Sequence, residues 1–352
     1  QEIQCQGSCV DNKLGKPIQI GKLERYISDT YDLPLTQENK ASGHVAVIGS
    51  GPAGLACAYD CAKAGLQVTI YDKNDGIGGV LRYGIPEYRL PKAILDRRIQ
   101  ELTQLGVIFK LNEAIGNELR YEDLMFKYDA LMIAVGSPLV NEIKTEGADH
   151  PRVIGWDRFL ENLNAGSDVF ESHYEKVKDI LVIGGGNVAM DVAKGAAMMN
   201  RKVDLIYRRT IPLMPARRME LQDILEHEVT IHELRDPIRI RPKGHRLEVE
   251  CKITKLLIDA DNPRGTIVDD EGTEIFVTDL FVLAVGAQNI AQALEGLTMD
   301  EFNKIVVNEN QETSVPFVYA AGDAVTGPKT VVHALSSGKR AAKAIIAALT
   351  HE

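Results

Sequence analysis

A glycine-rich stretch near the start of the chain has the residue types and spacing to hold a phosphate group. In HVAVIGSGPAGLACA, which begins at His44, the pattern G-x-G-x-x-G is filled by Gly49, Gly51 and Gly54. The first glycine permits a tight turn, the second lets a pyrophosphate approach the backbone, and the third lets a helix pack closely on a strand. The N-terminus of that helix would then hold the phosphates of a dinucleotide. A single match also fits an ordinary tight turn in any α/β core.

A second copy of the pattern makes the dinucleotide interpretation much stronger. DILVIGGGNVAMDVA begins at Asp179 and places Gly184, Gly186 and Ala189 at the three positions. Both copies predict a buried strand, a glycine-rich turn and the start of a helix. Two copies in this setting predict two dinucleotide sites on one chain.

The residues after each copy distinguish the two ligands. The strand VTIYDK places Asp72 eighteen residues past Gly54, where a carboxylate accepts hydrogen bonds from ribose hydroxyls. VDLIYRRT is expected to place Arg208 where Asp72 stands in the first copy, with Arg209 beside it. Because guanidinium forks match phosphate oxygens, the second site is predicted to bind the 2′-phosphate of NADP(H). A solvated arginine pair at a strand end is the alternative.

A second duplication indicates how the two units are arranged. LMIAVGSP contains Gly136 and FVLAVGAQ contains Gly286, and each is an apolar strand that ends in glycine. We interpret them as the closing strands of two Rossmann-like domains in an α/β fold. The NADP(H) domain, residues 152–286, would be inserted into a first domain made of residues 41–151 and 287–352. Residues 1–40 would form a short N-terminal segment and linker.

The C-terminal stretch VYAAGDAVTGPKTVVHALSSGKRAAKAI predicts a strand, a Gly-Asp turn and a helix. Asp323 could bond a ribityl hydroxyl of a flavin, or it could simply cap the helix. The helix is expected to begin near Lys329 or Thr330 and to aim its positive end at the pyrimidine edge of the isoalloxazine ring. The first dinucleotide would then be FAD.

Composition narrows the class of protein. The 352 residues are 45% hydrophobic, enough for two packed domains, and the formal charge of −10 argues against a broad nucleic-acid surface. No stretch approaches the length of a membrane span and the N-terminus lacks the order of a secretory signal, so a cytoplasmic protein is expected. Five scattered cysteines do not resemble a secreted disulfide framework.

Taken together, these motifs resemble those of the flavoproteins with two dinucleotide-binding domains. GGVLRYGIPEYRLPK, RRTIPLMPAR and AAGDAVTGPKTV resemble the small subunit of NADPH-dependent glutamate synthase. They are equally similar to the large subunit of NADH-dependent ferredoxin:NADP oxidoreductase, and more distantly to dihydropyrimidine dehydrogenase. The resemblance runs from Cys5 nearly to the C-terminus.

The resemblance implies a flavoprotein oxidoreductase subunit that exchanges hydride between NADP(H) and FAD and single electrons between FAD and iron-sulfur clusters of itself or a partner. It also implies that Arg89 contacts FAD. Because the flavin carries the chemistry, no catalytic side chain is expected. Motifs and resemblance together give as FAD-binding residues Gly49, Gly51, Pro52, Ala53, Gly54, Asp72, Lys73, Gly78, Gly79, Arg89, Gly136, Gly322, Asp323 and Thr330. For NADP(H) they give Gly184, Gly186, Asn187, Val188, Ala189, Arg208, Arg209, Arg217 and Gly286.

The N-terminal cysteines are explained by the same resemblance. In that family a helical domain carries two [4Fe-4S] clusters, and CQGSC with KPIQIGKLERYI matches the end of one ligand run. Cys5 and Cys9 would be its last two cysteines, so this chain holds an incomplete ligand set and a remnant of the domain. Free surface thiols or a disulfide in a flexible tail are the alternatives. The implied redox partner is a glutamate synthase large subunit, or a ferredoxin together with an NAD-linked subunit.

Two other functions use the same nucleotide domains. A disulfide or small-molecule reductase of the thioredoxin-reductase type needs a C-x2-C pair beside the flavin, and the sequence contains none. Cys57 and Cys61 are four residues apart on the first predicted helix and are expected to be core residues. A non-catalytic subunit that senses NADP(H) is the other alternative, and bleaching of the flavin by NADPH would exclude it.

Overall fold

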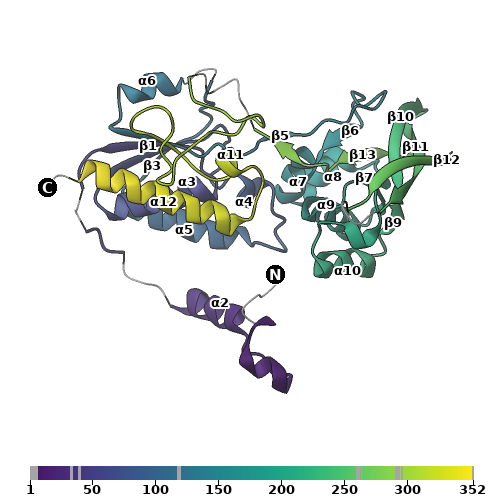
Figure 1. Ribbon diagram of the computed structural model, residues 1–352, viewed down its shortest axis with the longest axis horizontal. Helices are drawn as coiled ribbons and strands as arrows, with labels where there is room; N and C mark the ends of the chain where they lie inside the picture. Colours follow the sequence, from purple (N-terminus) through teal and green to yellow (C-terminus); the bar gives the residue numbers. More distant parts are fainter. Residues whose placement is uncertain are drawn as a thin grey trace.

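The computed structural model describes residues 7–31, 35–38, 41–116, 120–258, 262, 264–289, 294 and 296–350. In this part of the chain, two five-stranded parallel sheets lie at opposite ends of the molecule, each in a unit with one glycine-rich loop (Figure 1). The α/β fold with two parallel-sheet units that the sequence predicts is therefore confirmed.

The first sheet has the strand order β15-β4-β1-β2-β3, with every neighbouring pair parallel. All five strands are short, and all but the edge strand Ile108–Lys110 are largely buried apolar runs, as parallel sheets covered by helices require. They are β1 (His44–Ile48), β2 (Gln67–Tyr71), β3 (Ile108–Lys110), β4 (Ala130–Ile133) and β15 (Val318–Ala320).

Three long helices cover one face of this sheet: α3 (Pro52–Lys63), α5 (Lys92–Gln104) and α12 (Val331–Leu349) (Figure 1). The shorter helices of the unit are α4 (Val80–Tyr83), α6 (Tyr121–Met125) and α11 (Asp323–Thr326). Helix α12 packs so closely on α3 that a Cβ at Gly338 would lie 2.2 Å from the carbonyl oxygen of Ala53. A glycine is needed at this crossing.

The second sheet has the order β6-β13-β7-β8-β9 and is also parallel. Its strands are β6 (Val153–Gly155), β7 (Asp179–Ile183), β8 (Lys202–Tyr207), β9 (Thr230–Glu233) and β13 (Leu280–Leu283). Its helices are α7 (Trp156–Asn164), α8 (Ser167–Tyr174), α9 (Asn187–Met198), α10 (Arg218–Glu226) and the 3-10 turn η2 (Ile211–Leu213).

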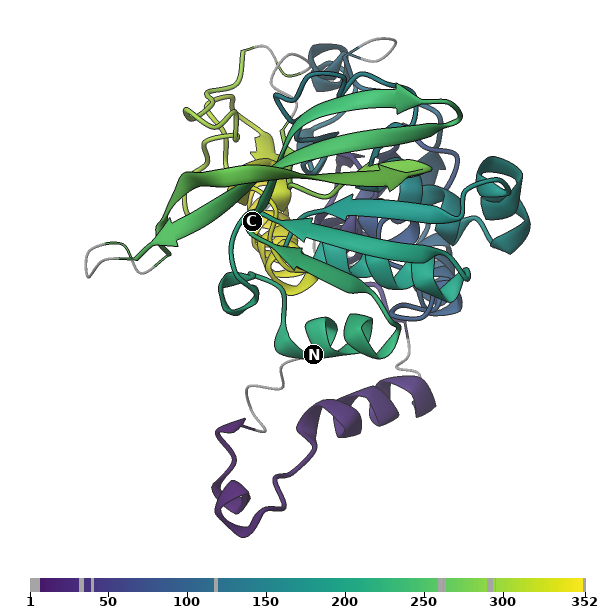
Figure 2. The same cartoon turned by 90° about the vertical axis from the view of Figure 1, so that its right-hand side faces the viewer.

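The other face of the second sheet is covered by an antiparallel sheet instead of helices (Figure 2). This sheet has the order β10-β11-β12, with bounds Arg235–Lys243, Arg246–Leu257 and Thr266–Thr278. Leu247, Val249 and Cys251 of β11 alternate inward and pack against Leu181 and Phe281 of the parallel sheet. This antiparallel layer was not predicted from the sequence.

A pair of short antiparallel strands joins the two units. The chain leaves the first unit through β5 (Leu139–Val140) and returns through β14 (Ala287–Gln288), where Ala287 pairs with Val140. β15 and α12 then complete the first sheet and its helical layer. The first unit is thus built from two stretches of sequence with the second unit between them.

The N-terminal segment 7–31 lies outside both sheet units and meets the first one at α5 (Figure 1). It contains η1 (Val10–Leu14) and α2 (Ile20–Thr30), neither of which has a buried residue. Arg97 of α5 donates a hydrogen bond to the carbonyl of Ser28 at 3.0 Å. Among all the described helices, none combines the length and apolar character needed to cross a membrane.

Candidate dinucleotide-binding cleft

The first glycine-rich loop makes a turn that side chains would block. Gly49 has φ +104°, and a Cβ there would lie 2.4 Å from the carbonyl oxygen of Ala134. A Cβ on Gly54 would lie 2.0 Å from the carbonyl oxygen of Gly49, so the helix α3 can approach only because this residue is glycine. A Cβ on Gly51 would meet nothing within 4 Å, which leaves its backbone open to a ligand.

Asp72 anchors this loop from the end of β2. Its side chain is 6% exposed, and its Oδ2 accepts hydrogen bonds from Ser50 N at 2.8 Å and Ser50 Oγ at 2.5 Å. Oδ1 accepts from Asn74 N at 2.9 Å, and Ser50 Oγ accepts from Gly78 N at 2.9 Å. The carboxylate therefore organises the loop as well as lining the cleft, and its contact with a ribose stays a prediction.

The second loop follows the same path with different support. A Cβ on Gly184 would lie 2.4 Å from the carbonyl oxygen of Ala284, and one on Gly186 would meet nothing within 4 Å. The ring of Tyr207 covers Gly185, where a Cβ would lie 2.5 Å from Cε2. Tyr207 is itself held by a hydrogen bond from its hydroxyl to the carbonyl of Leu213, at 3.1 Å.

The strand pairing corrects the predicted position of Arg208. Asp72 lies 23 residues after Gly49, and Tyr207 lies 23 residues after Gly184, with the same register of paired strands in both sheets. Tyr207, and not Arg208, therefore occupies the position of Asp72. The prediction was wrong by one residue, although the spacing in the sequence already indicates Tyr207: it lies eighteen residues past Ala189, as Asp72 lies eighteen past Gly54.

Arginines nevertheless gather at this end of the second unit. Arg208 is exposed, lines the cleft and forms no salt bridge with the described part of the chain. Arg209 also lines the cleft, and its Nε donates to the carbonyl of Arg264 at 3.3 Å. Arg264, in the turn between β11 and β12, lines the same region and was not predicted. The three side chains provide positive charge at the mouth of the second loop.

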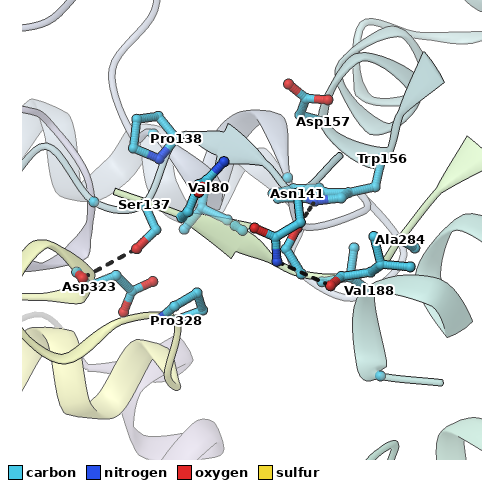
Figure 3. Close-up of a pocket in the computed structure, with 18 of the residues that line it drawn as sticks. Val80, Ser137, Pro138, Asn141, Trp156, Asp157, Val188, Ala284, Asp323 and Pro328 are labelled. Atoms are coloured by element: carbon cyan, nitrogen blue, oxygen red, sulfur yellow. Dashed lines mark hydrogen bonds between the residues drawn. The ribbon is translucent and has the colours of Figure 1, made fainter. Parts of the chain in front are cut away.

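Both loops open into one cleft of about 1450 Å³. Figure 3 shows its middle, where Val80, Ser137 and Asp323 of the first unit lie across from Val188 and Ala284 of the second. The predicted residues that line it are Gly49, Gly51, Pro52, Ala53, Asp72, Lys73, Gly79, Gly136, Gly184, Gly186, Asn187, Val188, Arg208, Arg209, Gly286, Gly322 and Asp323.

Several predicted residues support the cleft from behind. Gly54 provides the close helix packing described above, and Ala189 lies in the core of the second unit. Gly78 has φ +130° and donates its N–H to Ser50. Arg217 donates its backbone N–H to Asn187 Oδ1 at 3.0 Å, which ties the start of α10 to the start of α9.

The Gly-Asp turn before α12 also reaches the cleft. Gly322 has φ +73° and donates its N–H to the buried Ser337 Oγ at 3.0 Å. Asp323 Oδ1 accepts from Lys329 N at 3.2 Å, and burial raises the pKa of this carboxyl group. Helix α12 begins at Val331 with Thr330 as its N-cap, close to the predicted start. Thr330 is exposed and does not line the cleft.

Arg89 is not among the residues that line the cleft, and its predicted contact with FAD stays a prediction. Its two terminal nitrogens donate to the two carboxylate oxygens of Glu220, and its Nε lies against Asp191 Oδ1. Both acids belong to helices of the second unit. The guanidinium is therefore engaged in an ion pair between the units. The sequence could not show this, because Glu220 is 131 residues away.

The cysteines fall into two groups. Cys9 accepts a hydrogen bond from Ile18 N at 3.5 Å, while Cys5 lies outside the described residues. No group of three or more possible metal-ligating side chains occurs within the described ranges. Cys57 and Cys61 are buried in the core with their sulfur atoms 4.0 Å apart, and burial raises the pKa of Cys251 to about 12. These last three are core residues, as predicted for the first two.

Other residues of the site were not predicted. Ser50, which is buried beneath the first loop, comes directly after the first glycine and could have been found as a short polar residue inside the loop. Asn141 Nδ2 donates to the carbonyl of Val285 at 3.2 Å, and Trp156, the only tryptophan of the chain, donates its indole N–H to the carbonyl of Gly286 at 3.4 Å (Figure 3). These two lie at the joint between the units, which no local pattern marks.

Residues 43–338 match the pyridine nucleotide-disulphide oxidoreductase family. The chain belongs to this family. Over 369 residues it is 31% identical to the glutamate synthase [NADPH] small chain of Escherichia coli, covering 98% of this chain and 78% of that protein. It is therefore an oxidoreductase of the glutamate synthase small-chain type.

A second relative is much longer than the present chain. The NADP(+)-dependent formate dehydrogenase subunit beta of Moorella thermoacetica is 35% identical over 375 residues, covering 97% of this chain but only 52% of that protein. The chain thus spans about half the length of this relative. Among solved structures, Mycobacterium tuberculosis FprA in complex with NADPH has a TM-score of 0.71, 20% identity and coverage of 87% of this chain and 84% of that one. This likeness shows the fold.

Proposed function

We propose that this oxidoreductase binds FAD at the first loop and NADP(H) at the second, and that hydride passes between them in the shared cleft. The observation that carries the proposal is that two phosphate-binding loops from separate sheets open into one cavity. A volume of about 1450 Å³ exceeds the roughly 300–1,000 Å³ of a pocket for one small ligand. The cleft therefore has the size for two dinucleotides.

The residues present fit these two groups. Positions 51 and 186 leave open space where a Cβ would be, so a pyrophosphate can approach the backbone at the start of α3 and of α9. The strand ends differ in charge: Asp72 is suited to a ribose diol and Arg208 with Arg209 to a 2′-phosphate. This difference supports FAD in the first site and NADP(H) in the second.

The strand order brings the reactive ends of the two ligands together. A dinucleotide lies across the carboxyl ends of the strands, with its adenosine at the strand that comes after the glycine loop and helix. Its other half then extends past β4 and β15 in the first unit and past β13 and β6 in the second. These edges meet around Ser137, Asn141 and Ala284 (Figure 3). Bound FAD would supply the chemistry that accepts or returns a hydride, and the residues allow either direction.

We further propose that the electrons leave singly to an iron-sulfur partner. The support is that the glutamate synthase small chain and the formate dehydrogenase subunit beta are both named as subunits of larger enzymes. Within the described residues no group of three or more possible metal-ligating side chains occurs, and of the two predicted cluster cysteines only Cys9 lies among them. A glutamate synthase large subunit, or a ferredoxin with an NAD-linked subunit, would provide the acceptor.

An anaerobic titration tests this function. The purified chain loaded with FAD is mixed with NADPH or NADH while the flavin absorbance is recorded. We expect stoichiometric bleaching by NADPH at much lower concentration than by NADH, and no stoichiometric iron or sulfide on the chain. Failure of NADPH to bleach the bound flavin would overturn the hydride-transfer proposal, and a full complement of iron and sulfide would overturn the assignment of the cluster to a partner.

A further inference from the structure

One segment of the first unit is bonded to three helices of the second. In the segment 83–90, the carbonyl of Tyr83 accepts from Asn164 Nδ2 of α7 at 2.9 Å, and the Tyr88 hydroxyl donates to the carbonyl of Asp191 in α9 at 3.3 Å. Arg89 completes the set through its contacts with Asp191 in α9 and Glu220 in α10. We call the Arg89, Asp191 and Glu220 side chains the cross-unit clamp.

The three clamp side chains are largely buried, so removing one of their charges should cost much stability. The side chain of Arg89 is 23% exposed, and those of Asp191 and Glu220 are each 12% exposed. Burial raises the pKa of Asp191 to about 7, and the Arg89 guanidinium opposes this shift. Removing the guanidinium would leave two carboxylates close together with little water, which is a costly arrangement. Lys194 does not replace it directly, because its Nζ is paired with Asp223 at 2.6 Å.

The segment that carries Arg89 is itself held in shape. Lys92 Nζ donates to the carbonyl groups of Leu81 at 3.0 Å and Leu90 at 3.4 Å, and it also bonds the carbonyl of Ile85. One ammonium group thus donates hydrogen bonds to carbonyls at both ends of the turn. Arg89 therefore presents its guanidinium from a fixed backbone, and the geometry of the pair is set by the first unit.

The clamp acts on the helix that begins at the NADP(H) loop. Asp191 lies one turn after Asn187, and Asn187 and Val188 form the cleft-lining start of α9. The bond from Arg217 N to Asn187 Oδ1 joins α10 to the same point. A displacement of Asp191 or Glu220 would therefore also move the residues that would hold the pyrophosphate. None of the three clamp residues lines the cleft.

We propose that Arg89 is a positioning residue: by clamping α9 and α10 to the first unit, it sets the distance between the nicotinamide and the flavin. The functional part of this inference rests on the proposed hydride transfer, while the clamp itself is a property of the polypeptide. In this role the residue acts through its contacts with Asp191 and Glu220. Its loss should therefore affect the rate of hydride transfer far more than the binding of either dinucleotide.

The first test uses the protein without added nucleotide. Hydrogen exchange by mass spectrometry is compared for the wild type, Arg89→Ala and a matched control, Arg246→Ala. Arg246 also pairs with two carboxylates, those of Asp179 and Asp279, but entirely within the second unit. In Arg89→Ala we expect exchange to rise at least about tenfold in 83–90 and at the start of α9. The control should leave both regions unchanged, and equal effects would overturn the clamp.

The second test separates positioning from binding. Stopped-flow reduction of the FAD-loaded protein gives the dissociation constant for NADPH and the limiting rate of flavin reduction. We expect Arg89→Ala to lower the limiting rate at least about tenfold, with the dissociation constant changed less than about threefold. Arg89→Lys, which keeps the charge but not the fork, should recover part of the rate. A loss confined to the dissociation constant would overturn the positioning role.

A third variant covers the case in which Arg89→Ala does not fold. Glu220→Gln keeps the side-chain volume and leaves Asp191 to balance the guanidinium. It should raise exchange in 83–90 and lower the limiting rate in the same direction but by less, and a wild-type exchange pattern would overturn the clamp. If exchange rises as expected but NADPH fails to reduce wild-type flavin, the clamp stands and the proposed function fails.

Discussion

The two glycine loops follow the same path, but a charged carboxylate supports the first and a neutral aromatic ring supports the second. In the first unit, the Asp72 carboxylate accepts from the Ser50 amide and hydroxyl. In the second, the Tyr207 ring lies on Gly185 at the equivalent place. An acid can support a loop beside a ribose diol, but beside a 2′-phosphate its charge would repel the ligand. In the second unit the neutral Tyr207 ring supports the loop and adds no negative charge near the predicted phosphate.

The third position of each loop shows a further contrast. Gly54 has no room for a side chain, whereas Ala189 in the second unit is buried with its methyl group in place. The first helix therefore lies closer to its loop than the second does. Three sets of variants test how far these differences matter, beginning with the largest expected effect.

Gly54→Ala should be the most damaging change in either loop. The added Cβ would lie 2.0 Å from the backbone oxygen of Gly49, so helix α3 or the loop must move. We expect a loss of about 4 kcal/mol or more in the free energy of unfolding and loss of bound FAD. The matched change Ala189→Gly should cost only about 1–2 kcal/mol. Urea unfolding and the flavin content after gel filtration measure both, and similar losses in the two variants would contradict the comparison.

Replacing Arg208 and Arg209 together by Ala should weaken NADPH binding roughly ten- to a hundredfold, because charge-assisted contacts to a phosphate contribute about 1.5–3 kcal/mol. NADH, which lacks the 2′-phosphate, should lose much less. Dissociation constants from flavin-quenching titrations give the ratio. An equal loss for both nucleotides would show that these arginines do not recognise the phosphate.

Ser50→Ala tests the polar support of the first loop. The change removes a hydroxyl that bonds Asp72 and accepts from Gly78 N, and we expect a loss of about 1–3 kcal/mol in unfolding free energy. Tyr207→Phe keeps the ring over Gly185 and removes only the bond to Leu213, so it should cost about 1 kcal/mol or less. Urea midpoints rank the two variants. A larger loss for Tyr207→Phe would mean that the hydroxyl, and not the ring, supports the second loop.

The local parts of the site could be predicted from the sequence. Both loops, their strands and the start of α12 depend on glycine spacing and short apolar runs, which act over a few residues. The position equivalent to Asp72 was assigned to Arg208, one residue too far, although equal spacing from the third loop position, Gly54 or Ala189, gives Tyr207 from the sequence alone. Local spacing therefore identifies the two loops and also the equivalent ends of β2 and β8.

The contacts between the units could not be predicted in the same way. Arg89 and Glu220 meet across a long separation in sequence, and an arginine in a polar segment fits a phosphate as well as a carboxylate. The antiparallel sheet β10-β11-β12 was not predicted, although β11 alternates buried with less buried residues and Gly244 turns the chain from β10 into β11; that this sheet covers the parallel one is what no local pattern shows. These features depend on packing between distant segments.

The split of the first unit has a consequence for synthesis on the ribosome. The second parallel sheet is complete once β13 has emerged, but the first lacks β15 and α12 until the last part of the chain is made. We therefore expect the second unit to fold first. Until α12 is made, the strands of the first unit that were synthesised earlier keep exposed the apolar face that α12 will cover. During that interval the nascent first unit is the part of the molecule most exposed to aggregation and to chaperone binding.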